Sequence, residues 1–181
     1  MTTLLQARST YFEANGFGAD GGYSKSTVTV VVFGLPVSFP NTQARRRAVV
    51  FHDLHHIATG YLTNNLGESE ISAWELGSGC WAYRAAWVLN TWGLLLGGFK
   101  NPARVFQAFV RGRQTTNLYG RDADALLARE VEDVRQEMGL DAPRGRPSVA
   151  DAAVFGLHLA LSMSTAAVPV VFTVYLLRAL L

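Results

Sequence analysis

The sequence HDLHH at residues 52–56, followed by Glu68 after a gap of eleven residues, decides how the rest of the chain is read. Histidines four residues apart lie above one another on one face of a helix, and each neutral imidazole offers a nitrogen that binds metal ions. Residues 59–67 have the composition of a turn, so the chain can reverse and bring Glu68 back. Asp53 can bind the same ion or orient a ligand. We therefore predict a set of two histidines and two carboxylates, His52, Asp53, His56 and Glu68, which suits Zn²⁺ or Fe²⁺.

The alternative is a polar, hydrogen-bonded helix face that holds no metal, because this spacing also arises without a ligand. His55 points about a quarter-turn away from His56, so we interpret it as a surface histidine or as a support for a ligand. The pattern differs from the His-Glu-x-x-His of metalloproteases, since Asp53 replaces the glutamate.

We expect two helices to carry this pattern. The first runs from about Thr42, a capping residue, to Gly60. The second begins near Glu68 and continues to about Phe99, and it places Glu75 on the same stripe as Glu68 while Glu70 points elsewhere. Glu75 is a candidate as an extra ligand, a base or a supporting carboxylate. Alternatively, it is a buried partner for Arg84 or for an imidazole, because unpaired charges are costly inside a protein.

The fold class predicted for the whole chain is mainly α, a helical bundle with a small N-terminal β-hairpin and a long apolar C-terminal helix or helical hairpin. The hairpin joins a strand at 26–33, rich in β-branched residues, to a shorter strand at 36–39 across Gly34. Further helices are expected at 2–15, 102–113, 122–128 and 130–138. We divide the chain into an N-terminal helix and hairpin (1–41), a metal-site domain (42–147) and an apolar C-terminal segment (148–181).

The C-terminal segment carries no Asp, Glu, Lys or Arg between residues 152 and 177, which exceeds the ~20 apolar residues needed to cross a bilayer. We interpret it as a membrane anchor or hairpin, with a kink at Pro169. A buried core helix and a helix that forms an oligomer are the alternatives, and we expect a homo-oligomer. The apolar stretch 85–99 is too short to span a bilayer comfortably and is expected to pack in the core or against lipid.

The charge and the cysteine content of the chain bear on which classes of function are possible. The formal net charge is only +2, so nothing indicates nucleic acid as a partner. The arginines cluster at 45–47 and again between 104 and 121, which fits anionic head groups but more commonly marks a solvated face. The single cysteine, Cys80, excludes an internal disulfide, and we expect it to pack within an apolar helix. The first eight residues lack the apolar run of a secretory signal.

At residues 52–68 the pattern His-Asp-x-x-His-x₁₁-Glu resembles the Coq-four family of coenzyme Q (ubiquinone) biosynthesis proteins, whose hallmark has the same residues at the same spacing. The resemblance covers roughly residues 42–140. It includes the basic run at 45–50, TG at 59–60, TNNLGE at 63–68, RGR at 111–113, ALL at 125–127 and VRQEMGL at 134–140.

This resemblance implies a mostly helical protein that holds a divalent metal, Zn or Fe, through His52, Asp53, His56 and Glu68. It also implies a hydrophobic groove for an isoprenoid or quinone-type lipid, and attachment to the cytoplasmic face of a membrane, or to the matrix face in a mitochondrion. The family supports oxidative decarboxylation at C1 of the quinone precursor and organises other quinone-biosynthesis enzymes. The N-terminal strand pair and the apolar tail depart from the ordinary family pattern, which points to a divergent branch acting on another lipid.

Three functions therefore remain open. The first is a membrane-associated metalloprotein in which Glu75 transfers protons, a role that requires a pKa raised by burial. Tryptophans 74, 81 and 87 then line a tail channel or simply pack in the core. The second is a non-catalytic lipid-binding scaffold whose metal is fully coordinated by protein. The third is a metal-dependent lipid hydrolase, although the sequence has no Gly-x-Ser-x-Gly nucleophile.

Overall fold

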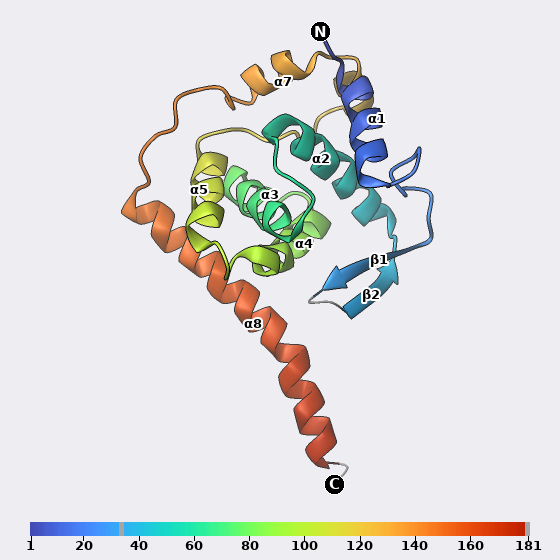
Figure 1. Ribbon diagram of the computed structural model, residues 1–181. Helices are drawn as coiled ribbons and strands as arrows, with labels where there is room; N and C mark the ends of the chain where they lie inside the picture. The colour runs from blue at the N-terminus through green and yellow to red at the C-terminus, as the bar shows by residue number, and fades with distance from the viewer. Residues whose placement is uncertain (33–34, 180–181) are drawn as a thin grey trace.

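The computed structural model describes residues 1–32 and 35–179, with side chains described for 1–29 and 36–167. Within these residues the chain forms eight helices and one two-stranded antiparallel sheet, which confirms the predicted fold class (Figure 1). The elements in chain order are α1 (Leu4–Asn15), β1 (Thr27–Val32), β2 (Leu35–Pro40), α2 (Gln43–Thr59), α3 (Asn65–Ser78), α4 (Arg84–Gly97), α5 (Pro102–Arg113), α6 (Ala123–Leu127), α7 (Val131–Glu137) and α8 (Val149–Ala179).

Both ends of α2, the helix that carries the histidines, are defined by a capping residue. Thr42 caps its first turn by accepting a hydrogen bond from the Arg45 N–H, as the sequence predicts. Gly60, at φ +76°, ends the helix in the left-handed region. Two arginines then donate to the last carbonyls: Arg111 to Thr59 at 3.2 Å and Arg135 to Ala58. Cations at this end also favour the helix dipole.

The helix predicted to run from Glu68 to Phe99 is wrong, because the chain breaks it into α3 and α4. Gly79 adopts φ +92° and ends α3, and the chain then turns through residues 80–83. Cys80 lies in this connection rather than in a helix, although it is buried as predicted. The break allows α4 to fold back and pack against α3.

Glycines bring the neighbouring helices unusually close to α3. A Cβ on Gly112 of α5 would lie 2.2 Å from the Trp74 carbonyl oxygen, and one on Gly77 would lie 2.3 Å from the Phe109 carbonyl oxygen. On the α4 side, Ser69 donates to the Gly93 carbonyl at 2.9 Å and accepts the Gly97 N–H at 2.6 Å. The core around this crossing includes Leu54, Ile71, Trp74, Leu94, Val105 and Phe109. It holds α3 rigidly against α4 and α5, so the carboxylates of α3 are positioned by packing.

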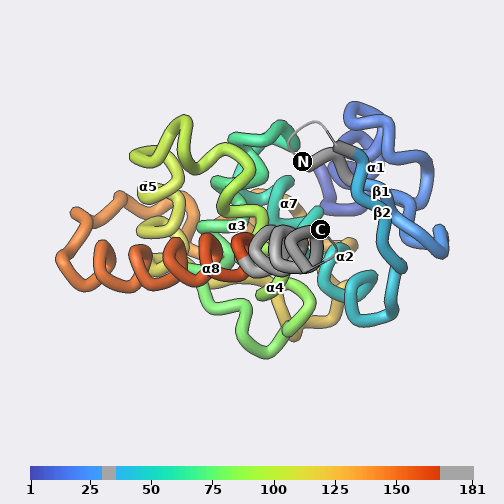
Figure 2. The backbone as a smooth tube through the Cα atoms, turned by 90° about the horizontal axis from the view of Figure 1, so that it is seen from below, coloured from blue at the N-terminus to red at the C-terminus, as the bar shows by residue number. Residues whose placement is uncertain are grey.

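Ser148 precedes the last helix, α8, and its N–H and hydroxyl both donate to the Asp151 carboxylate in the first turn. Arg113 of α5 donates to the same carboxylate at 2.5 Å. Over its first turns α8 lies across α4 and α5 (Figures 1 and 2), where Phe155 contacts Phe109. The segment Val149–Ala167 is long and apolar enough to cross a membrane by length and composition, and little of it is buried. The kink expected at Pro169 and the turn expected at Gly34 lie outside the fully described residues.

Candidate metal centre

Three of the four predicted ligands converge between α2 and α3. His52 and His56 lie one helical turn apart on α2, and their Nε2 atoms are 3.1 Å from each other. Glu68, in the first turn of α3, places one carboxylate oxygen 3.5 Å from the Nε2 of His52 and the other 3.5 Å from the Nε2 of His56. One candidate ligand atom from each residue lies within 4.8 Å of the other two, so the group is arranged to hold a metal ion.

The hydrogen bonds at the far side of each ring determine which nitrogen is free. The Nδ1 of His56 lies 2.8 Å from the Tyr61 carbonyl oxygen, which can only accept, so this nitrogen carries the proton. The Nδ1 of His52 lies 3.0 Å from the Glu75 carboxylate and donates to it in the same way. A neutral ring with its proton on Nδ1 would turn the Nε2 lone pair towards the other ring and towards Glu68, whereas a ring protonated on both nitrogens donates to Glu68. A cation, or a proton on one ring, is needed to relieve this opposition.

The environment of Glu68 keeps it ionised and accessible. Partial burial alone would raise its pKa, but hydrogen bonds and charge from His52 and His56 outweigh this effect and lower the pKa to about 2. Its side chain is 29% exposed and that of His52 is 20% exposed, whereas that of His56 is buried. The group therefore has two imidazoles and one carboxylate, with one side open to solvent.

Asp53, the fourth predicted ligand, does not join this group in the described residues. Its carboxylate is buried and accepts a 2.6 Å hydrogen bond from the Tyr23 hydroxyl, which comes from the glycine-rich loop after α1. Burial raises the pKa of Asp53, and the bond from Tyr23 offsets part of the increase. Tyr11 of α1 stacks on the His56 ring at 5.8 Å between centroids. Asp53 is thus placed beside the group, where it holds the loop over α2.

Glu75 lies on the same side of α3 as Glu68, but it is completely buried and surrounded by donors. One of its oxygens accepts from the Nδ1 atoms of His52, at 3.0 Å, and His55, at 2.7 Å. The other accepts from the Asn90 amide at 2.5 Å and the Tyr119 hydroxyl at 2.6 Å. The partner of Glu75 is therefore an imidazole, one of the two buried partners considered from the sequence, and not Arg84.

The pKa of Glu75 is shifted in the direction opposite to the one that proton transfer requires. Burial alone would raise it, but the charge and hydrogen bonds of His52, together with those of His55, hold the pKa well below its ordinary value. The effect on His52 is the reverse. Burial alone would lower the pKa of His52, but the charge of Glu75 and the hydrogen bond to Glu68 outweigh burial and raise this pKa well above its ordinary value. Glu75 is consequently an ionised carboxylate that supports a ligand histidine, rather than a protonated acid that could donate a proton.

His55 is part of this support, and the expectation of a surface position is wrong. Its ring is fully buried; Nδ1 donates to Glu75, and Nε2 accepts the Leu118 N–H at 2.9 Å. Sequence reasoning missed Asn90 and Tyr119 as partners of Glu75, because they reach it from α4 and from the loop after α5. The one local signal for Asn90 was its place beside Thr91, two polar residues within a largely apolar stretch.

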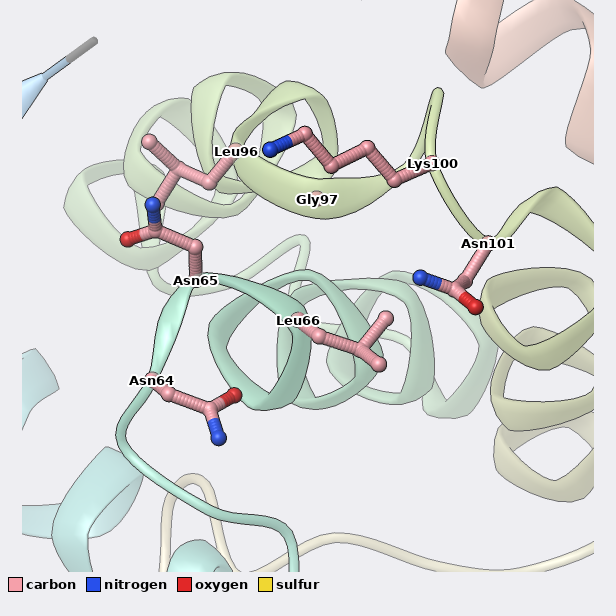
Figure 3. Close-up of a pocket in the computed structure, with 7 residues that line it drawn as sticks. All are labelled: Asn64, Asn65, Leu66, Leu96, Gly97, Lys100 and Asn101. Atoms are coloured by element: carbon pink, nitrogen blue, oxygen red, sulfur yellow. The ribbon is translucent and has the colours of Figure 1, made fainter.

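The tryptophans and the groove that were expected to bind a lipid tail do not form one channel. Trp74 is a core residue, Trp87 is partly buried and Trp81 is 69% exposed, so the three do not line one channel. A surface hollow of about 510 Å³ lies where α3 begins and α4 ends (Figure 3). Its lining mixes polar and apolar residues: Asn64, Asn65, Leu66, Leu96, Gly97, Lys100 and Asn101. None of the three residues of the metal group lines it, and with three amides and an ammonium it differs from the apolar groove that the resemblance implies.

Fold and site together define a mainly helical protein with a candidate two-histidine, one-carboxylate metal centre between two helices. Comparisons with family models, with curated proteins and with solved structures give no match to the chain.

Proposed function

We propose that this protein is a membrane-associated metalloprotein that binds one divalent cation through His52, His56 and Glu68 and acts on a lipid. The observation that carries the proposal is the convergence of three groups: the two Nε2 atoms lie 3.1 Å apart, and each is 3.5 Å from an oxygen of the Glu68 carboxylate. Imidazole and carboxylate ligands suit Zn²⁺ and also Fe²⁺. Because three protein ligands leave a position of a tetrahedron vacant, the set is of the kind found in catalytic rather than closed structural sites.

In this proposal the protein groups have separate tasks. His52, His56 and Glu68 hold the ion, which when bound would polarise an oxygen of the substrate or serve as a redox centre. Tyr61 and Glu75 fix the ring tautomers from behind. Asp53 and Tyr23 tie the loop after α1 to α2 on the other side. The substrate would approach from the side where Glu68 and His52 are exposed.

For the substrate we propose a prenylated aromatic or related quinone-type lipid, by resemblance of residues 42–140 to the Coq-four family. The corresponding reaction is oxidative decarboxylation at C1 of the quinone precursor. Exposed apolar side chains support a lipid partner: Val88 and Trp92 on α4 and Leu157 on α8 are all open to solvent.

Metal analysis tests the first part of the proposal. The full chain, purified in mild detergent and freed of loosely bound ions, should contain about one Zn or Fe per chain. His52→Ala should contain far less, because two remaining ligands bind weakly. Glu70→Gln is the matched control, since Glu70 is on the same helix but pairs with Arg104. Absence of metal from the wild-type chain, or equal content in His52→Ala, would refute the proposal.

A second candidate is a non-catalytic lipid-binding scaffold with a structural metal. It is favoured by the state of Glu75, since this carboxylate accepts four hydrogen bonds and is held ionised, so the buried acid that is bonded to His52 is not a proton donor. Loading the protein with Co²⁺ and adding azide distinguishes the two. A vacant position binds azide and changes the visible spectrum of Co²⁺, whereas a fully coordinated structural ion gives no change.

Membrane attachment through α8 is tested with charges on its exposed face. Leu157 is 71% exposed and Leu161 is 37% exposed, so Leu157→Glu with Leu161→Glu should leave the fold intact. Charged side chains are costly in hydrocarbon, and the double variant should therefore move from the membrane pellet to the supernatant. Leu5→Glu on α1, whose side chain is 49% exposed, is the control. Unchanged sedimentation of the double variant would show that α8 does not attach the protein.

A further inference from the structure

We propose that Glu75 is the positioning residue of the metal centre: its carboxylate fixes the tautomer and the direction of the His52 ring, so that Nε2 faces the cation. The inference rests on the proposed function, because it concerns a ligand of the proposed metal. Glu75 does not contact the ion itself in this scheme. It acts through His52, whose Nδ1 lies 3.0 Å from its carboxylate oxygen.

The geometry gives Glu75 little freedom to do anything else. It is 0% exposed, and both of its oxygens accept two hydrogen bonds. Its donors come from α2, from α4 and from the loop before α6, so the carboxylate cannot rotate without breaking bonds to three parts of the chain. A buried ionised carboxylate that accepts from the distal nitrogen of a ligand histidine raises the basicity of that ligand.

His55, on the same helix α2 as His52, also holds the Glu75 carboxylate in place. Its Nε2 accepts the Leu118 N–H, so its Nδ1 must carry a proton and donates it to the Glu75 oxygen that also binds His52. His55 thus fixes the carboxylate that fixes His52. This role explains why three histidines occur at 52, 55 and 56 although two of them face the candidate ion.

The two ligand histidines are therefore supported differently. His56 donates to the neutral Tyr61 carbonyl, and His52 donates to a charged carboxylate. Charge-assisted hydrogen bonds are the stronger kind, so the His52 ring should be held in its orientation more firmly than the His56 ring. Neutralising Glu75 should therefore weaken metal binding even where the shape of the site survives.

The test is Zn²⁺ affinity of the full chain, measured by competition with a chromophoric chelator. Glu75→Gln keeps the side-chain shape, and its amide oxygen can still accept from His52 and His55. Loss of the charge should weaken Zn²⁺ binding about 10- to 100-fold. Glu70→Gln is the matched control, because it neutralises another acid of the same helix that pairs with Arg104 rather than with a histidine. It should leave the affinity within about twofold.

The outcomes separate the two proposals. A wild-type chain that takes up no Zn²⁺ refutes the proposed function, and the role of Glu75 falls with it. If the wild type binds tightly and Glu75→Gln binds equally tightly, only the role of Glu75 is refuted.

A second measurement needs no variant and so covers the case in which Glu75→Gln does not fold. The ¹⁵N chemical shifts of His52 in the Zn²⁺-loaded wild type should show a protonated Nδ1 and a metal-bound Nε2. Metal bound through Nδ1 would overturn the inference.

Discussion

Glu68 and Glu75 lie two turns apart on α3 and both bond to histidines of α2, yet they occupy opposite environments. Glu75 is enclosed and accepts four hydrogen bonds, so its charge is fully compensated by protein. Glu68 is partly exposed and faces two nitrogens that have no proton to give when the rings are neutral. The difference shows how one helix pair can provide both a ligand and its support: four donors enclose the support, whereas the ligand lies beside two imidazole nitrogens and stays partly open to solvent.

The largest expected effect is a difference in the free energy of unfolding that is lost when each carboxylate is removed. Glu75→Ala leaves two imidazole N–H groups, an amide and a hydroxyl without their buried acceptor, and should cost about 3–5 kcal/mol. Glu68→Ala, at a partly exposed position, should cost about 1 kcal/mol or less in metal-free protein. Urea unfolding in the presence of a chelator measures both. Equal losses would remove the distinction between ligand and support.

The next effect concerns stabilisation by metal. A cation that binds only the folded chain should add about 2.7 kcal/mol to the free energy of unfolding when free Zn²⁺ is 100 times the dissociation constant. For a chain of this size that corresponds to a rise in Tm of roughly 5–10 °C. Glu68→Ala should lose most of this rise, although it changes the metal-free protein little. A Zn²⁺-dependent rise that persists in Glu68→Ala would exclude Glu68 as a ligand.

These contrasts also show what the sequence could reveal. Spacing along a helix and a turn composition were enough to bring His52, His56 and Glu68 together, because i, i+4 geometry and chain reversal are local properties. The stripe that placed Glu75 near Glu68 was local as well. The sign of its pKa shift was not, since it depends on the charge and hydrogen bonds of His52 and His55, which reach Glu75 only when α2 packs beside α3.

The same limit applies to Gly79 and to Asp53. An apolar run hides a helix break, and the left-handed backbone of Gly79 becomes necessary only when α4 must return along α3. Asp53 follows His52 directly, so spacing alone could not decide between binding a metal and accepting from Tyr23, which is thirty residues away in the chain. In both cases a contact between distant segments determined the outcome.

The smallest effect comes from the third acid of α3. Glu70 forms a two-point bond with Arg104, at 2.9 Å and 3.1 Å, but the Arg104 side chain is 59% exposed and the pair is open to solvent and salt. Glu70→Gln should therefore cost less than about 1 kcal/mol, with the loss shrinking further at high ionic strength. Zn²⁺ affinity should be unchanged. Urea unfolding at low and high salt, together with the chelator competition, measures both quantities. A loss comparable to that of Glu75→Ala would mean that the number and the burial of the donors, which distinguish Glu75 from the likewise buried Glu70, do not determine what a carboxylate on this helix contributes.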